Sequence, residues 1–223
     1  MNNSRTVFLL AICWLASMPA AAQHFVGVSG GYATNSLSSS IPNDLRPVSQ
    51  WGNYGIVYKF YGSAPLWPEG AVSRIGTGLQ SGINFTTRGY QRDSTAIFRY
   101  RAVEIPFMTH FHASFWKIRV IGAAGLYASY LLDGTQTDLD PLATTPTVIA
   151  EGAYSFQSID RRFDYGLRFG GALALMLHPI EIQFELNYAI GLGYMRDPVI
   201  PGQYTVYYRF SQMIFSLNAF IVL

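Results

Sequence analysis

The stretch from Ile180 to Ile190 alternates between apolar and polar side chains over most of its length. Successive side chains of a β-strand point to opposite faces. One face of this segment is therefore apolar, and the other carries Glu181, Gln183, Glu185 and Asn187. The pattern predicts a strand that lies between an apolar environment and a polar one.

Segments of the same kind, rich in Gly, Tyr, Phe, Val and Ile, recur along the chain without helical periodicity between them. We predict eight strands, at residues 24–34, 52–62, 71–86, 98–112, 115–132, 162–177, 180–194 and 204–223. The connections alternate in length: the long ones are 35–51, 87–97, 133–161 and 195–203, and the short ones are 61–70, 112–114 and 178–179. Short turns at one end and long loops at the other are typical of outer-membrane β-barrels with both termini in the periplasm.

The composition favours the same architecture. Half of the residues are hydrophobic and 13% are charged, against roughly 25% charged in soluble domains. Beyond residue 22 the sequence has no run of apolar residues long enough for a helical span. Only helices and closed barrels satisfy every backbone group in lipid. The sequence therefore predicts an all-β fold, an eight-stranded antiparallel up-and-down transmembrane β-barrel. The alternative is a soluble lipocalin-like barrel with its polar face outward, which would have to pack all of these apolar side chains inside.

The first 22 residues predict a cleaved signal peptide, which leaves the barrel domain at 23–223. Arg5 precedes an apolar run at 7–16, and three alanines at 20–22 form a small-residue cleavage site. Cys13, the one cysteine, lies in this segment, so we expect no disulfide or thiol chemistry in the mature chain. The basic residues are scattered and the net charge is +2, which argues against a nucleic-acid partner.

An eight-stranded barrel has an interior just wide enough for side chains to fill. The charged positions predicted to face this lumen are Lys59, Arg74, Glu104, Lys117, Arg119, Asp164, Arg168, Glu181 and Glu185. Buried charges persist only when they are paired. Depth counted from the short turns predicts pairs between Glu104 and Arg168, and between Lys117 or Arg119 and the glutamates at 181 and 185. We therefore predict a lumenal ion-pair network of Glu104, Lys117, Arg119, Arg168, Glu181 and Glu185, which fills the barrel; a proton or ion pathway is the alternative.

Catalytic and metal-binding patterns are weak. His112 and Ser114 superficially resemble the pair of lipid A deacylases, but they fall in a predicted periplasmic turn. Three aspartates in the longest loop, Asp133, Asp138 and Asp140, lack the glycine and terminal glutamate of a calcium loop. We expect no cofactor, no metal and no enzymatic activity.

Three segments carry a family resemblance. Residues 100–107, Tyr-Arg-Ala-Val-Glu-Ile-Pro-Phe, resemble the Tyr-x-Glu-Ile-Pro strand of the PorT-like outer-membrane β-barrel family of Bacteroidota, and residues 122–132 and 163–171 support the match. Val103 adds a residue relative to the tightest form of that motif. The resemblance implies a small barrel with the same loop alternation, a link of some relatives to a secretion system, and no catalytic residues.

The sequence thus predicts an outer-membrane barrel that serves as a surface anchor, binding or scaffold component through its external loops, particularly 133–161. The expected partners are outer-membrane lipid, the barrel-assembly machinery, and envelope or secretion-system proteins bound by the loops. The alternatives are a lipid-modifying enzyme and a narrow channel.

Overall fold

The computed structural model describes residues 23–39, 45–62, 74–93, 95–143, 145, 147–158, 160–195 and 208–223. These residues form one antiparallel sheet with the strands β1 (Gln23–Ser39), β2 (Leu45–Tyr61), β3 (Arg74–Arg92), β4 (Ala96–Phe115), β5 (Ile118–Leu139), β6 (Val148–Ala153), β7 (Phe163–Leu177), β8 (Ile180–Gly191) and β9 (Tyr208–Val222). In the described part of the chain, no helix is long and apolar enough to cross a membrane.

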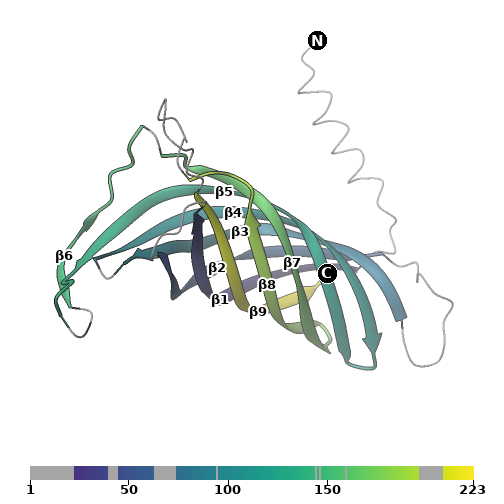
Figure 1. Cartoon of the computed structure of the whole chain (residues 1–223). Coiled ribbons are helices and arrows are strands. Elements are labelled where there is room, and N and C mark those ends of the chain that lie inside the picture. Colours follow the sequence, from purple (N-terminus) through teal and green to yellow (C-terminus); the bar gives the residue numbers. More distant parts are fainter. Residues whose placement is uncertain are drawn as a thin grey trace, which may run out of the picture.

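Eight of the strands close into a ring in the order β1-β2-β3-β4-β5-β7-β8-β9, and β9 returns to pair with β1 (Figure 1). The closing seam runs from the pair Phe25–Val222 to the pair Ser39–Tyr208. The predicted eight-stranded up-and-down barrel is confirmed. The remaining strand, β6, pairs with the far end of β5 at residues 135–139 and extends the wall beyond the ring. The sequence predicts a loop at 133–161, so β6 is not among the predicted strands.

Strands β1 to β5 are longer at the loop end than the sequence predicted, whereas β7 begins at Phe163 and β8 ends at Gly191, inside the predicted boundaries at 162 and 194. The following parts of predicted loops are strand: residues 35–39, 45–51, 87–92, 96–97 and 133–139. Each predicted strand ended where its outward-facing positions stop being apolar. Beyond that point the outward positions become polar, as at Arg99 and Arg101, while the backbone pairing of β4 with β5 continues to Ala96 and Asp138. Residues 71–73, 204–207 and the predicted signal peptide lie outside the described residues.

The turn between β4 and β5 also differs from the prediction. Residues 112–114 are part of β4, and the chain reverses at Trp116 and Lys117, after the pair Phe115–Ile118. Trp116 has a left-handed φ of 51°. The predicted turn at 178–179 is confirmed between β7 and β8.

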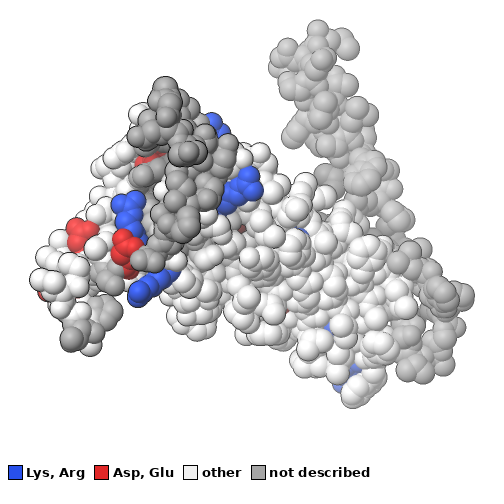
Figure 2. All heavy atoms as spheres, in the orientation of Figure 1, with Lys and Arg blue, Asp and Glu red and all other residues white. Residues whose placement is uncertain are grey.

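The two faces of the wall have opposite chemistry. Large apolar side chains are exposed on the outside, among them Ile56, Ile105, Phe107, Leu126, Phe184 and Leu217, while Lys59, Glu104, Glu181 and Gln183 are buried inside. Figure 2 shows an outer surface almost free of charge, with acidic and basic side chains gathered mainly toward the end that carries β6. This arrangement is typical of transmembrane barrels. It contradicts the lipocalin-like alternative, which needed the polar face outside.

Candidate functional site in the barrel lumen

The charged side chains inside the barrel form two layers. The turn-side layer consists of Lys59, Arg119, Glu181 and Glu185; the loop-side layer consists of Arg88, Glu104, Asp164 and Arg168. All eight residues are buried. Each layer contains two basic and two acidic residues, so its formal charges cancel.

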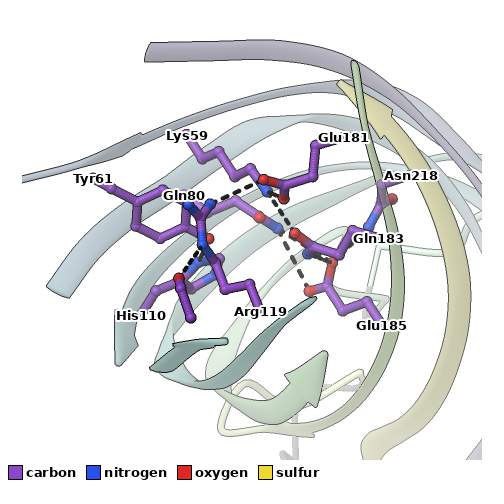
Figure 3. A network of polar contacts seen from close by, with 10 residues as sticks. Lys59, Tyr61, Gln80, His110, Arg119, Glu181, Gln183, Glu185 and Asn218 are labelled. Atoms are coloured by element: carbon purple, nitrogen blue, oxygen red, sulfur yellow. Dashed lines mark hydrogen bonds and ion pairs between the residues drawn. The ribbon is translucent and has the colours of Figure 1, made fainter. Parts of the chain in front are cut away.

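The turn-side layer is centred on Glu181 (Figure 3). This carboxylate pairs with the Lys59 ammonium from across the lumen and with Nη1 of Arg119 at 2.9 Å. Lys59 Nζ also donates to Oε1 of Gln183 at 2.6 Å and lies 3.8 Å from the ring centroid of Phe220. A buried ammonium is stable only when such partners replace its water.

Glu185 is bound differently. Among the described residues its hydrogen-bond partners are side-chain amides rather than the cation that the sequence predicted. Its carboxylate accepts hydrogen bonds from Nδ2 of Asn187 at 2.6 Å, Nδ2 of Asn218 at 2.8 Å, Nε2 of Gln183 at 3.1 Å and Nε2 of Gln80 at 3.4 Å. Gln183 links Glu185 to Lys59, because its side chain donates to the Glu185 carboxylate and accepts from the Lys59 ammonium.

The loop-side layer is a chain of alternating charges. Arg168 pairs with Oε1 of Glu104, and Nη2 of Arg88 pairs with Oε2 of the same carboxylate at 3.1 Å. Arg88 also pairs with Asp164, which accepts a hydrogen bond from the Tyr127 hydroxyl at 2.9 Å. The two arginines therefore share Glu104, so that removal of this one side chain breaks two buried ion pairs.

The structure brings together part of the predicted network. Glu104 lies with Arg168, and Arg119 with Glu181. Lys117 does not face the lumen: it is exposed in the β4–β5 turn, with its ammonium 5.2 Å from the Trp116 ring centroid. The prediction for Lys117 was wrong because the turn interrupts the strand alternation there. The side chain of Arg74 lies outside the described residues.

Three members of the layers, Arg88, Lys59 and Asp164, were not assigned to the network from the sequence. Arg88 lies in the predicted loop 87–97. It follows Asn84 and Thr86 at intervals of two residues, however, and so continues the inward face of β3. Lys59 and Asp164 were predicted to face inward but were given no partner. Their partners come from other strands across the lumen, and sequence alternation gives no distance across a barrel.

A cavity of about 40 Å³ lies between the two layers. Glu104 and Arg168 contribute to its lining from one side, and Gln80, Glu185, Asn187 and Asn218 from the other. Six lining residues carry a buried polar atom without a hydrogen-bond partner in the protein: Asn53, Gln80, Asn84, Arg168, Asn187 and Asn218. Since one water needs about 10–15 Å³ measured in this way, the cavity has room for a few waters. It is too small for a diffusing nutrient.

One apolar cluster packs inside the barrel around the turn-side layer, and a second packs beyond the loop-side layer. The turn-side cluster consists of Phe25, Val57, Tyr61, Ile121, Ala172, Ala174 and Phe220. The loop-side cluster consists of Leu37, Tyr90, Ala96, Phe98, Tyr100, Ala102, Leu131, Met195 and Phe210. Tyr154 and Phe156, which follow β6, pack against the loop-side cluster, with their ring centroids 5.4 and 5.9 Å from that of Tyr100. Side chains therefore fill the lumen at successive depths.

The residues considered for catalysis do not form a catalytic arrangement. Oγ of Ser114 accepts a hydrogen bond from Nε of Arg119 at 3.1 Å, and the His112 ring packs against Tyr61 with centroids 4.4 Å apart. The part of the chain that the structure describes contains no group of three His, Cys, Asp or Glu residues arranged to hold a metal ion.

The aspartates of the longest predicted loop are bound separately. Asp133 pairs with Arg101 on the outer face, Asp138 accepts a hydrogen bond from Gln136, and Asp140 accepts one from the backbone N–H of Leu142. These contacts do not direct the three carboxylates toward a common point, as a calcium site requires.

The comparison with family models agrees with the architecture. A family model described as outer membrane protein beta-barrel domain matches residues 21–195. Among curated proteins, no sequence matches the chain. Similar solved structures include Ail, the attachment invasion locus protein of Yersinia pestis (11% identity, 90% of this chain and 99% of that chain, TM-score 0.39). A second is the N-terminal β-barrel domain of Pseudomonas aeruginosa OprF (9% identity, 87% of this chain and 97% of that chain, TM-score 0.38). A third is the outer membrane protein AlkL in DMPC lipid bilayers (12% identity, 90% of this chain and 90% of that chain, TM-score 0.43).

Proposed function

The chain belongs to the outer membrane protein beta-barrel domain family, and from that premise we propose that it is a closed, non-enzymatic barrel that anchors a binding or scaffold surface at the outer membrane. The observation that carries the proposal is that two charge-neutral layers and two apolar clusters together fill the lumen. A lumen filled in this way supports a structural role for the barrel rather than passage of solute.

The loop end of the barrel is the surface that we propose for binding. There the strands continue past the apolar outer band, and β5 with β6 forms a projecting hairpin. Tyr154 and Phe156 hold the segment after β6 against the loop-side apolar cluster. Binding residues are commonly carried by loops that a rigid scaffold positions. In our proposal this end is external, and the short turns, which lie at the same end as Gln23 and Val222, are periplasmic.

We expect the full chain, inserted into a planar lipid bilayer, to show no unitary current on the nanosiemens scale. The double variant Y154A/F156A removes the two rings that pack on the loop-side cluster and should stay closed, because the charged layers beneath remain. Stepwise currents from the unmodified chain would overturn the proposal. Currents from the double variant alone would show that the aromatic rings, and not the layers, close the barrel.

A role in protein secretion is supported only by the resemblance to PorT-like proteins. It is tested separately, by deletion of the gene and measurement of secreted cargo. Unchanged secretion in the deletion strain would remove this part of the proposal without affecting the closed barrel.

A further inference from the structure

A pocket of about 440 Å³ is located at the loop end of the wall formed by β5, β7 and β8. Its lining consists of Tyr130, Arg161, Arg162, Phe163, Tyr165, Leu192, Gly193 and Tyr194. The pocket exists because β7 begins only at Phe163, whereas its neighbour β5 continues to Leu139. After β8 the chain continues alongside the start of β7, where the N–H groups of Leu192 and Gly193 both donate to the carbonyl oxygen of Tyr165.

Four of the lining side chains continue the apolar outer band. Tyr130, Phe163, Tyr165 and Leu192 are 43%, 56%, 50% and 40% exposed. Aromatic side chains at this position of a transmembrane barrel lie at the boundary between hydrocarbon and headgroups. The part of the pocket that these four side chains form therefore faces acyl chains.

Two arginines contribute the positive charge of the pocket. Nε of Arg162 donates to the carbonyl oxygen of Leu131 at 2.9 Å, and Nη2 donates to that of Leu132. Its guanidinium lies over the rings of Tyr130 and Phe156, at 5.0 and 4.6 Å from their centroids. The backbone of Arg161 is fixed by a hydrogen bond to the carbonyl oxygen of Met195 at 2.8 Å. Both arginines thus belong to a hydrogen-bonded part of the wall.

The described lining of the pocket contains no acidic residue. Among the carboxylates near it in sequence, Asp133 pairs with Arg101 and also interacts electrostatically with Arg162, Asp160 accepts a hydrogen bond from the Tyr154 hydroxyl, and Asp164 pairs with Arg88 inside the lumen. A positive pocket above an apolar wall is complementary to an anion that carries a hydrocarbon chain.

We propose that this pocket binds the phosphate headgroup of an anionic membrane lipid, with one acyl chain lying between the aromatic side chains and Leu192. Arginine presents a planar set of N–H donors that matches phosphate oxygens. The volume lies within the range of about 300–1,000 Å³ that is usual for ligand pockets. The proposal does not depend on whether the lumen conducts.

The test compares two lipids that differ only in phosphate. The full chain, purified in a neutral detergent, is titrated with phosphatidic acid or with diacylglycerol of the same acyl chains, and bound lipid is measured by native mass spectrometry. We expect phosphatidic acid to bind more tightly. The variant R161Q/R162Q should weaken its binding by on the order of 100-fold, about tenfold for each charge-assisted contact.

Two further variants distinguish the contribution of the acyl chain from that of the headgroup, and specific binding from a general effect of positive charge on the protein. L192W fills the apolar part of the pocket and should weaken phosphatidic acid binding while both arginines remain. R46Q is the matched control: Arg46 is an exposed arginine on β2, across the ring from β7, and its loss should leave binding unchanged. Folding of each variant is checked by heat-modifiable gel migration; if R162Q disturbs the wall, R161Q and L192W carry the test. Equal binding of diacylglycerol, competition by inorganic phosphate alone, or unchanged binding by R161Q and L192W would overturn the proposal.

Discussion

Replacement of Glu104 by glutamine should destabilise the barrel by about 3–5 kcal/mol, the usual cost of leaving a buried ion pair without one partner. Glu104 is 1% exposed and accepts ion pairs from both Arg88 and Arg168. Glutamine preserves the shape but removes the charge that the two guanidinium groups share. The measurement is the free energy of unfolding in urea, with the protein inserted in lipid vesicles.

The control for this variant is Asp133→Asn, which breaks the exposed pair with Arg101, whose side chain is 74% exposed. Exposed ion pairs contribute little to stability, so we expect an unchanged unfolding midpoint. A second variant, E104Q/R168M, replaces both members of a buried pair by neutral groups and should recover part of the lost stability. If E104Q is as stable as D133N, the ion pairs of the loop-side layer do not stabilise the fold.

Replacement of Gly125 by alanine should prevent formation of the folded barrel or destabilise it by at least about 3 kcal/mol, the upper part of the range for overpacking. Gly125 lies in β5 between Met108 of β4 and Arg168 of β7. A Cβ atom there would lie 2.0 Å from the carbonyl oxygen of Phe107 and 2.7 Å from the Cα atom of Met108. Both are backbone atoms, so the wall itself would have to move. The measurement is heat-modifiable gel migration followed by urea unfolding.

Gly30 provides the matched control for Gly125. It lies in β1, and a Cβ atom at this position would meet nothing within 4 Å. Gly30→Ala should therefore fold and migrate like the unmodified chain. Equal behaviour of the two variants would mean that the close approach at Gly125 does not constrain the barrel.

The sequence predicts the ring well because two kinds of observation agree. Alternation assigns each side chain to a face, and connection length assigns each strand end to one side. Together they place Glu104 with Arg168 and Arg119 with Glu181, as the structure does. The extended ends of β1 to β5 and the strand β6 were missed, because outward polar positions at the loop end no longer show an apolar alternation.

The chemistry of the lumen could be predicted only in part. Glu185 was expected to pair with a cation, but four neutral amides bind it, and a neutral amide gives no charge signal in the sequence. Lys59 reaches Glu181 from the opposite wall, a contact that depends on barrel diameter rather than on residue spacing. Pairing between strands that are two apart in the ring, as for Glu104 with Arg168, is thus easier to predict than contact across the lumen.

The zero formal charge of each lumenal layer has a consequence for electrical behaviour. The work done by a membrane potential is proportional to the charge displaced, about 2.3 kcal/mol for one elementary charge across 100 mV. A layer with two positive and two negative side chains has no net charge on which the potential can act. Voltage should therefore not drive either layer along the barrel axis, and an applied potential should leave the lumen as closed as it is at rest.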